Sequence, residues 1–392
     1  MIKNTNNFFK VVIITSYPFP DSAATANRVS ILAKEISLKS HFNVVILGPG
    51  PSETMERVAI KQPGNYSVIS VNHSTIRQSN LLLRALGEIK QTWHLLKKAQ
   101  SLNADFYIVT IPSIFLILTP TILRTKVIIF DFRDLLWEYL IKLGGTKKFI
   151  GSITKFTMPY FLRRAKAITV TNHFEKEELS KLTQVPIEIV GNGISQDRFN
   201  ILKVLKPTLC DNPYKVIYIG NLGIAQKLET LLEAIGGDEN FEIVLIGDGS
   251  RADFLKGLTF HNNMTNVKFT GALQWQDILS YIKQSNCLYG QIAASYTSAV
   301  PSKLFEYLSC GRPVVFGLPD GAARDLVSSF ENIYICTPEN PNELREKMEA
   351  LRRDMSDVTL SISSNRHKIQ QNHLRENEAK RLIGIIESYI EE

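Results

Sequence analysis

The sequence predicts two α/β domains, each a Rossmann-like, doubly wound parallel sheet covered by helices. The first reason is that short β-branched runs alternate with amphipathic segments along the 392 residues, a pattern typical of parallel sheets. The second is that this alternation stops at residues 201–214, where periodicity is lost and proline appears. We therefore expect a first domain over 1–200, a linker over 201–214, a second domain over 215–362 and a charged helical segment over 363–392.

The first domain opens with a strand, a helix and a second strand. Short apolar runs typical of strands that are buried on both faces predict strands at 10–16, 44–47, 66–71, 106–111 and 166–172, and one that begins at Lys126. Helical spacing of apolar residues predicts helices over 29–40 and 81–100.

Charged residues gather where the strand from Lys126 ends. Asp131, Arg133 and Asp134 follow its apolar run directly. Ligands of open α/β sheets bind at the carboxyl ends of strands, so these side chains are candidates for a site. A salt bridge that only fixes the loop would explain them as well.

The second domain repeats the alternation. Strands are expected at 215–220, 241–247, 267–271, 287–292 and 313–317, and helices at 226–235, 251–257, 275–284 and 303–310. Two of the strand-to-helix loops contain glycine pairs, namely Gly220 with Gly223 and Gly247 with Gly249. Glycine lets the backbone approach a ligand closely, although a glycine pair alone is weak support.

Residues 291–319 contain only three charged side chains, Lys303, Glu306 and Arg312. Glu306 lies on a mostly apolar helix, and a buried carboxylate needs partners. A ligand rich in hydroxyl groups would serve, and so would Lys303 one helical turn back. The small, polar loop 293–300 runs into the start of this helix, where N–H groups and the helix dipole favour an anion such as a diphosphate.

The segment 300–315, VPSKLFEYLSCGRPVV, resembles the donor-binding signature of GT-B glycosyltransferases of family 4, in particular enzymes of bacterial capsule and O-antigen synthesis. In that family two glutamates stand eight residues apart, and the second holds the ribose of the donor. Glu306 matches the second glutamate, whereas the first falls on Ser298. The segment 131–138 resembles the same subgroup more loosely, and the segment 187–199 resembles the turn at the end of the first domain in the wider family.

The resemblance implies a retaining enzyme that takes a sugar from a nucleotide-diphosphate donor, UDP-linked, with no metal and no other cofactor. The implied catalytic residues are Glu306, Lys303, Asp131 and Asp134. The implied donor-binding residues are Gly220, Asn221, Gly223, Lys227, Gly247, Gly249, Ser298, Ala299, Val300, Ser302, Lys303 and Glu306. The implied acceptor-side residues are Asn27, Arg28 and Arg133. Where the family has Arg and Lys for the diphosphate, this chain has Asn221 and Gln226, so either Lys227 or Lys303 supplies the charge.

The same fold implies that segment 363–392 crosses back onto the first domain, and that donor and acceptor bind to different domains. Two alternatives stay open. One is a UDP-sugar 2-epimerase, which needs acids and bases around the sugar, and loop 293–300 contains none. The other is a non-catalytic homologue, which Ser298, Asn221 and Gln226 would suit.

Charge is unevenly distributed. Residues 1–200 hold 25 Lys and Arg against 14 Asp and Glu, a net charge of +11, and the remainder has a net charge of −4. Residues 139–166 contain seven basic residues and no acid, interleaved with aromatic residues. This mixture suits an anionic membrane surface and a polyprenyl-diphosphate-linked acceptor, although an ordinary solvated face is the alternative. Nucleic acid is disfavoured because no zinc-finger or RNA-binding signature is present.

Cysteine spacing and hydropathy bear on location. Cys210, Cys287, Cys310 and Cys336 show neither close pairing nor metal-ligand spacing, so we expect reduced, structural thiols. The longest apolar runs fall far short of the ~20 residues that cross a bilayer. We therefore expect a cytoplasmic protein, peripheral on the inner face of the cell membrane.

Overall fold

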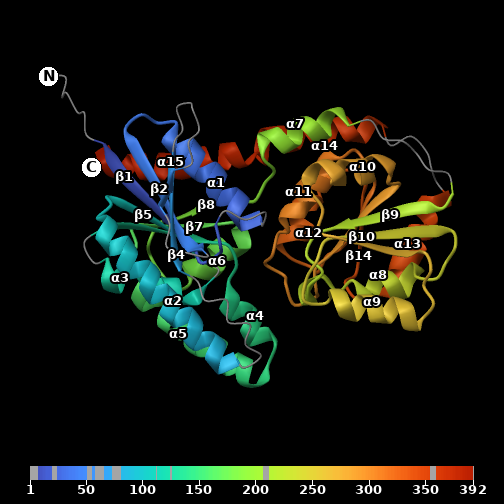
Figure 1. Cartoon of the computed structure of the whole chain (residues 1–392), viewed down its shortest axis with the longest axis horizontal. Coiled ribbons are helices and arrows are strands. Elements are labelled where there is room, and N and C mark those ends of the chain that lie inside the picture. The colour runs from blue at the N-terminus through green and yellow to red at the C-terminus, as the bar shows by residue number, and fades with distance from the viewer. Residues whose placement is uncertain are drawn as a thin grey trace. The chain divides into compact units, whose positions relative to one another are not determined.

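The computed structural model describes residues 8–19, 24–50, 55–57, 66–72, 81–111, 113–123, 126–205, 212–353 and 359–391. The chain divides into two compact units. Unit 1 comprises Met1–Gly191 with Arg375–Glu392, and unit 2 comprises Asn192–Leu374. Each unit contains one sheet with helices on both faces, so the predicted doubly wound architecture is present in both (Figure 1).

The sheet of unit 1 has, within the described residues, the strand order β3-β4-β2-β1-β5-β6-β7-β8. Its strands are β1 (Phe9–Ile14), β2 (Phe42–Gly50), β3 (Met55–Arg57), β4 (Tyr66–Asn72), β5 (Phe106–Ile111), β6 (Val127–Phe132), β7 (Ala167–Val170) and β8 (Ile187–Ile189). Its helices are α1 (Ala24–Ser37), α2 (Leu81–Leu102), η1 (Ile114–Leu118), α3 (Thr119–Ile122), α4 (Leu136–Lys142), α5 (Gly145–Leu162), α6 (His173–Ser180) and α15 (Arg375–Glu391). Neighbouring strands pair in parallel except β3, which runs antiparallel to β4.

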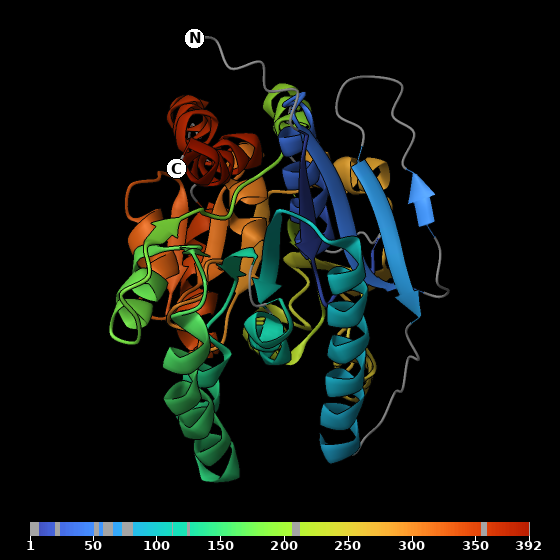
Figure 2. The ribbon, with the colours of Figure 1, turned by 90° about the vertical axis from the view of Figure 1, so that its left-hand side faces the viewer.

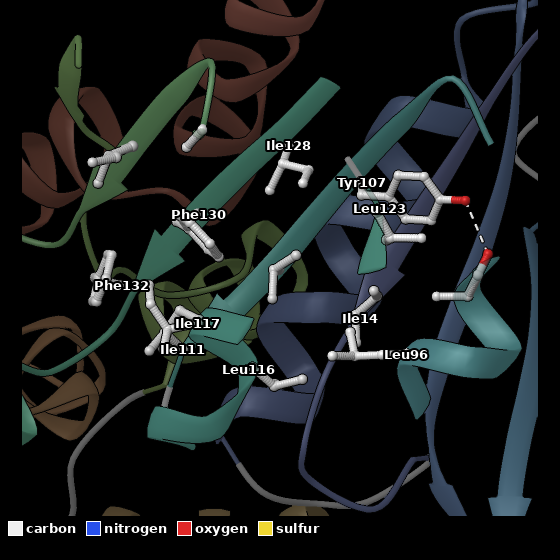
Figure 3. Packing of buried hydrophobic residues seen from close by; sticks show 14 of the residues in the cluster. Ile14, Leu96, Tyr107, Ile111, Leu116, Ile117, Leu123, Ile128, Phe130 and Phe132 are labelled. Atoms are coloured by element: carbon white, nitrogen blue, oxygen red, sulfur yellow. Dashed lines mark hydrogen bonds between the residues drawn. The ribbon is translucent and has the colours of Figure 1, made fainter. Parts of the chain in front are cut away.

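Both faces of this sheet are buried, because successive residues of each strand point to opposite sides. On β1, Val12 and Ile14 join one core while Val11 and Ile13 join the other. Figure 3 shows part of the first core, in which Tyr107 also donates its hydroxyl to a carbonyl oxygen of α2, that of Ala99, at 2.9 Å. The second core is closed by α1 and α15.

The sheet of unit 2 is parallel, with the order β11-β10-β9-β12-β13-β14. Its strands are β9 (Tyr214–Ile219), β10 (Phe241–Ile246), β11 (Val267–Gly271), β12 (Cys287–Gln291), β13 (Val314–Gly317) and β14 (Ile333–Cys336). Its helices are α7 (Gln196–Val204), η2 (Ile224–Gln226), α8 (Glu229–Ile235), α9 (Ala252–His261), α10 (Trp275–Gln284), α11 (Ser302–Ser309), α12 (Ala322–Val327), α13 (Pro341–Arg353) and α14 (Thr359–Asn372).

The unit boundaries differ from the predicted ones. The chain leaves unit 1 after Gly191, and α7, whose last turn falls in the predicted linker, buries Phe199 and Leu202 in a core of unit 2. Residues 206–211 of that linker, with Cys210, lie outside the described residues. At the other end, α14 packs Ile369 into the same core, so only α15 returns to unit 1.

Three further features bear on the predictions. The expected helix over 226–235 is interrupted, because Lys227 has a left-handed backbone between η2 and α8. The described cysteines, Cys287, Cys310 and Cys336, are buried and form no disulfide. Among the described helices, none combines the length and the hydropathy needed to cross a bilayer.

Candidate functional site

The loops at the carboxyl edge of the unit 2 sheet contain most of the predicted donor-binding residues. From β9 the chain winds outward first through β10 and β11, and then returns to place β12 on the other side of β9. The gap between β9 and β12 is therefore a topological switch point, where open α/β sheets bind ligands. The loops after β9 and β12 flank this point, and they are joined by a hydrogen bond from Ala293 N to Ala225 O of 2.8 Å.

The glycine loops after β9 and β10 pack directly against each other. Gly220 and Gly247 have φ values of 158° and 139°, and a Cβ on Gly247 would lie 1.8 Å from Gly220 O. Gly223 and Gly249 are crowded by the side chain of Asn221 in the same way. The observed close approach is thus between two stretches of the protein, and the predicted contact of these glycines with a ligand stays a prediction.

Glu306 lies on α11 with its carboxylate only 9% exposed, between two cations. Arg198 from α7 donates to Oε1 at 2.5 Å, and Lys303 donates to Oε2 at 2.8 Å. Burial would raise the pKa of Glu306, but the charges and hydrogen bonds of Lys303 and Arg198 hold it below its usual value. The predicted burial and the alternative partner Lys303 are both present.

Arg198 was not predicted. Its guanidinium also lies over the ring of Trp275, 4.5 Å from the centroid, at the start of α10. The ion pair of Arg198 with Glu306 joins residues 108 positions apart, so the alternation of strands and helices could not reveal it. The one sequence signal that could have pointed to Arg198 is its position in the segment 187–199, which resembles the family.

The loop between β12 and α11 is held at several points. Thr297 O accepts from Ala322 N at 2.9 Å, and Ala299 N donates to Tyr296 O at 3.3 Å. Val300 O accepts from the side chain of Asn192 at 2.9 Å. Ser298, where the family has its first glutamate, is buried. Helix α11 begins at Ser302, so the loop 293–300 leads into the start of a helix, as predicted.

Both lysines proposed for the diphosphate have carboxylate partners. Lys303 is held by Glu306, as described above. Lys227 pairs with Glu339, which follows β14, with 3.2 Å between Nζ and Oε2. Glu339 is a second charged residue that the sequence patterns did not single out.

The cluster predicted at the end of β6 is present in unit 1. Asp131 is fully buried, and its Oδ1 accepts from Thr169 Oγ1 at 2.8 Å, Arg28 at 3.2 Å and Arg133 at 3.3 Å. Burial raises the pKa of Asp131, but the charges of Arg28 and Arg133 outweigh that effect and lower it. Asp134 is exposed and accepts from the hydroxyl of Tyr139 at 3.2 Å.

Arg28, in α1 directly after Asn27, makes hydrogen bonds to other residues of unit 1. It donates to Gly191 O at 2.6 Å and to Val190 O at 3.0 Å, and burial together with the charge of Arg133 lowers its pKa to about 10. Arg28 therefore fixes the last residues before the unit boundary. Its predicted contact with a phosphate stays a prediction.

Glu175, a buried carboxyl of α6, was missed by the sequence analysis. Its Oε2 accepts from Thr171 N at 2.8 Å and from Thr171 Oγ1 at 2.7 Å, while Asn172 caps α6 by accepting from Glu175 N at 3.0 Å. Burial and the nearby charge of Asp134 raise the pKa of Glu175 to about 8. The sequence signal was the capping box, an Asn followed three residues later by Glu.

Solved structures share this architecture over nearly the whole chain. Sucrose-phosphate synthase from Thermosynechococcus elongatus has a TM-score of 0.77 at 15% identity and covers 97% of this chain and 99% of its own. Anabaena HepE in complex with UDP and glucose has a TM-score of 0.68 at 16% identity and covers 97% and 100%. WaaG, a glycosyltransferase involved in lipopolysaccharide biosynthesis, has a TM-score of 0.65 at 14% identity and covers 95% and 98%. The fold is therefore the GT-B fold.

The sequence of unit 2 matches a known family. Residues 205–373 match the family described as Glycosyl transferases group 1. The uncharacterized glycosyltransferase MJ1178 of Methanocaldococcus jannaschii is 21% identical over 34% of this chain and 36% of its own length. The putative colanic acid biosynthesis glycosyl transferase WcaI of Escherichia coli is 26% identical over 35% of each chain. The aligned regions span about a third of these relatives.

The predicted fold and the resemblance to glycosyltransferases are thus confirmed. The assignment to family 4, the capsule and O-antigen context and the roles of individual residues stay predictions.

Proposed function

We propose that the protein is a retaining glycosyltransferase that moves a sugar from a UDP-linked donor to a precursor of a bacterial polysaccharide. The observation that carries this proposal is the position of Glu306, which lies inside the matched domain and is held at a defined place by Arg198 and Lys303. HepE, whose fold is similar, has been solved with UDP and with UDP-glucose, and this supports a uridine nucleotide.

In the proposed reaction, Glu306 accepts hydrogen bonds from the ribose hydroxyls of the donor. A carboxylate that is already ionised and fixed needs little reorganisation to do so. The diphosphate leaving group is neutralised by a lysine at the switch point and by N–H groups of the loop before α11. No metal or further cofactor takes part in this proposal. The departing phosphate helps to remove the proton of the acceptor hydroxyl, so no protein base is required.

A panel of nucleotides tests the donor class. UDP and UDP-sugars should raise the melting temperature, because a ligand that binds only the folded state stabilises it by mass action. Sugar transfer or slow hydrolysis of UDP-glucose, UDP-galactose or UDP-N-acetylglucosamine would then show catalysis. Binding without turnover would favour the non-catalytic alternative, and exchange of the C2 hydrogen of the sugar with heavy water would favour the epimerase. A melting temperature unchanged by every nucleotide would contradict the proposal.

We further propose that unit 1 docks on an anionic membrane, where a polyprenyl-diphosphate-linked acceptor would be presented. Helix α5 projects beyond the sheet of unit 1 (Figures 1 and 2). One face of it, at the spacing i, i+4, i+7, i+11, carries Phe149, Ile153, Phe156 and Tyr160, and all four are exposed. Phe149 and Phe156 are 69% and 86% exposed, which is unusual for phenylalanine unless something covers it.

Basic residues lie at both ends of this face. Lys147 and Lys148 are exposed in the first turn of α5, and Arg163 and Arg164 follow its last turn with their guanidinium groups over the ring of Tyr160. An aromatic face between basic ends matches the apolar and anionic layers of a membrane surface. Lys155 is a correction to the seven basic residues expected over 139–166, because its charge is already paired with Glu138 at 2.8 Å and with Glu178 at 3.6 Å.

A further inference from the structure

Two residues of unit 2 share an unusual backbone. Five described residues other than glycine have a left-handed conformation, and three of them are asparagines, which adopt it readily. The other two are Lys227, with φ of 44°, and Glu339, with φ of 60°. Their side chains form an ion pair with each other. Strained backbone persists only where surrounding contacts hold it, and it concentrates at functional sites.

The contacts that hold both backbones converge on Gln291, the buried last residue of β12. Gln291 donates to Lys227 O at 2.9 Å and accepts from Glu339 N at 3.2 Å, so one side chain fixes both left-handed residues. Gly317 leaves the space for it, because a Cβ there would lie 2.6 Å from Gln291 Oε1. Glu339 is also held through its Oε1, which accepts from Ala294 N at 3.2 Å. The loops after β9, β12 and β14 are therefore joined at the switch point.

We propose that Glu339 is a counter-ion that holds Lys227 until the diphosphate of the donor takes its place. This inference rests on the proposed function, and it assigns Lys227 to the leaving group. The side chains of Lys303 and Lys227 are equally exposed, at 34% and 33%, but their partner carboxylates differ, because Glu306 is 9% exposed and Glu339 is 39% exposed. An ion pair with an exposed carboxylate is weak and exchanges readily, while removing the cation from a buried carboxylate is costly.

The exchange has a consequence for specificity. A diphosphate carries more negative charge than one carboxylate, so it can replace Glu339 at Lys227. A nucleoside carries no charge to offer in return for breaking the pair. Glu339 thus lowers the affinity for every anion at this place by the free energy needed to break its pair with Lys227, and an anion must offset that cost in order to bind.

A double-mutant cycle tests the pair, with UDP, GDP and inorganic diphosphate as probes in calorimetry of the full chain. Glu339→Gln keeps an oxygen for Ala294 N and removes only the charge, so the best probe should bind roughly three- to tenfold more tightly. Lys227→Met should weaken binding by at least that factor. In the double variant, the gain from Glu339→Gln should disappear, because no lysine is left to release. Glu349→Gln, which removes another partly exposed acid paired with arginine in unit 2, is the matched control and should leave the affinity unchanged.

The outcomes separate this inference from the proposed function. If wild type binds a probe and Glu339→Gln binds it equally well, the counter-ion role is wrong and the proposed function stands. The same holds if the gain survives in the double variant, because Glu339 would then repel the diphosphate without acting through Lys227. If wild type binds none of the three probes, both fall.

Discussion

Three carboxylates of the two units are each paired with at least one cation. Glu306 has Arg198 and Lys303, Asp131 has Arg28 and Arg133, and Glu339 has Lys227. A buried carboxylate stays ionised only with such partners, and removal of one member leaves the other uncompensated. For substitutions at these positions, ligand affinity and the stability of the protein should therefore be measured together.

Glu306→Gln should weaken UDP binding by about 1.5–3 kcal/mol, because a hydrogen bond from the ribose to a charged group is replaced by one to a neutral amide. It should also lower the melting temperature, since Arg198 and Lys303 lose their shared anion. Calorimetric titration and thermal unfolding of the same samples measure both effects. Glu346→Gln, on the exposed face of α13, is the control and should change neither. An unaltered UDP affinity would remove Glu306 from the donor site.

Glu175 predicts a pH dependence of stability. Its pKa in the folded state, about 8, lies above the ordinary value of 4.5, so the folded protein binds the proton more tightly than the unfolded chain. Its contribution is therefore favourable at low pH and is lost as pH rises toward 8. Glu175→Gln, which keeps an acceptor for Thr171, should remove this dependence. The variant should gain on the order of a few kcal/mol relative to wild type between pH 5 and pH 8.5, measured by urea unfolding. Parallel pH profiles for the two proteins would refute the assignment.

Among the secondary-structure elements, those with a strong local pattern were predicted well. The predicted bounds of α10, 275–284, are confirmed, because its apolar residues follow one face closely. The helix expected over 226–235 was not, since the contact that holds Lys227 in a left-handed conformation comes from Gln291 in a different strand. Contacts of this kind, like that between Arg198 and Glu306, arise only when distant segments meet, and periodicity carries no information about them.

Helix α5 gives a prediction about charge. Replacing Lys147, Lys148, Arg163 and Arg164 by Gln should release the protein from anionic liposomes, because each basic residue near such a surface contributes about 1 kcal/mol. UDP binding should not change, since these residues belong to unit 1 and the proposed donor site to unit 2. Cosedimentation at low and high salt measures the release. A wild-type protein that stays in the supernatant with anionic liposomes at low salt would show that α5 is an ordinary solvated face.

The apolar face of α5 gives a separate prediction. Phe149→Ser with Phe156→Ser should weaken liposome binding even at low salt, because less apolar surface remains to enter the bilayer. The melting temperature should stay within a few degrees of wild type, since both rings are largely exposed in the folded protein. Leu162→Ser is the informative contrast, because Leu162 is fully buried and its loss should destabilise unit 1. Binding unchanged by the double substitution would leave electrostatics as the whole attraction.

For the molecule as a whole, the two units should respond differently to a nucleotide. Each unit has apolar cores of its own, so the unfolding of the two units can be partly independent. UDP at about 100 times its Kd should stabilise the unit that binds it by ~2.7 kcal/mol, a shift of roughly 5–10 °C. Scanning calorimetry combined with hydrogen exchange would assign the shifted transition to unit 2. A shift confined to unit 1 would contradict the prediction that the nucleotide binds to unit 2.

The whole-molecule boundary shows where prediction from sequence ended. The switch from unit 1 to unit 2 at Gly191 is marked only by the turn-forming residues Gly191, Asn192 and Gly193 between β8 and α7, and the alternation of strands and helices continues through it. The loss of periodicity at 201–214 was visible, but it lies inside unit 2, and its first residues still belong to α7, which packs there. Helix α14 misled in the same way, since a polar helical segment gives no indication of which of two cores its few apolar residues will enter.

The return of α15 to unit 1 sets the order in which the chain can fold as it is made. Unit 2 is one continuous segment and can complete its core as soon as Leu374 has emerged from the ribosome. Unit 1 is made first but must wait, because Ala379, Leu382, Ile383 and Ile386 close the core against β1 and α1. Through the synthesis of some 180 intervening residues, an apolar face of the nascent unit 1 stays uncovered. If a premature stop codon ends the chain just after residue 374, unit 2 should therefore fold while unit 1 stays incomplete. The exposed apolar face of unit 1 should then make the truncated protein aggregate and become a target for chaperones and proteases.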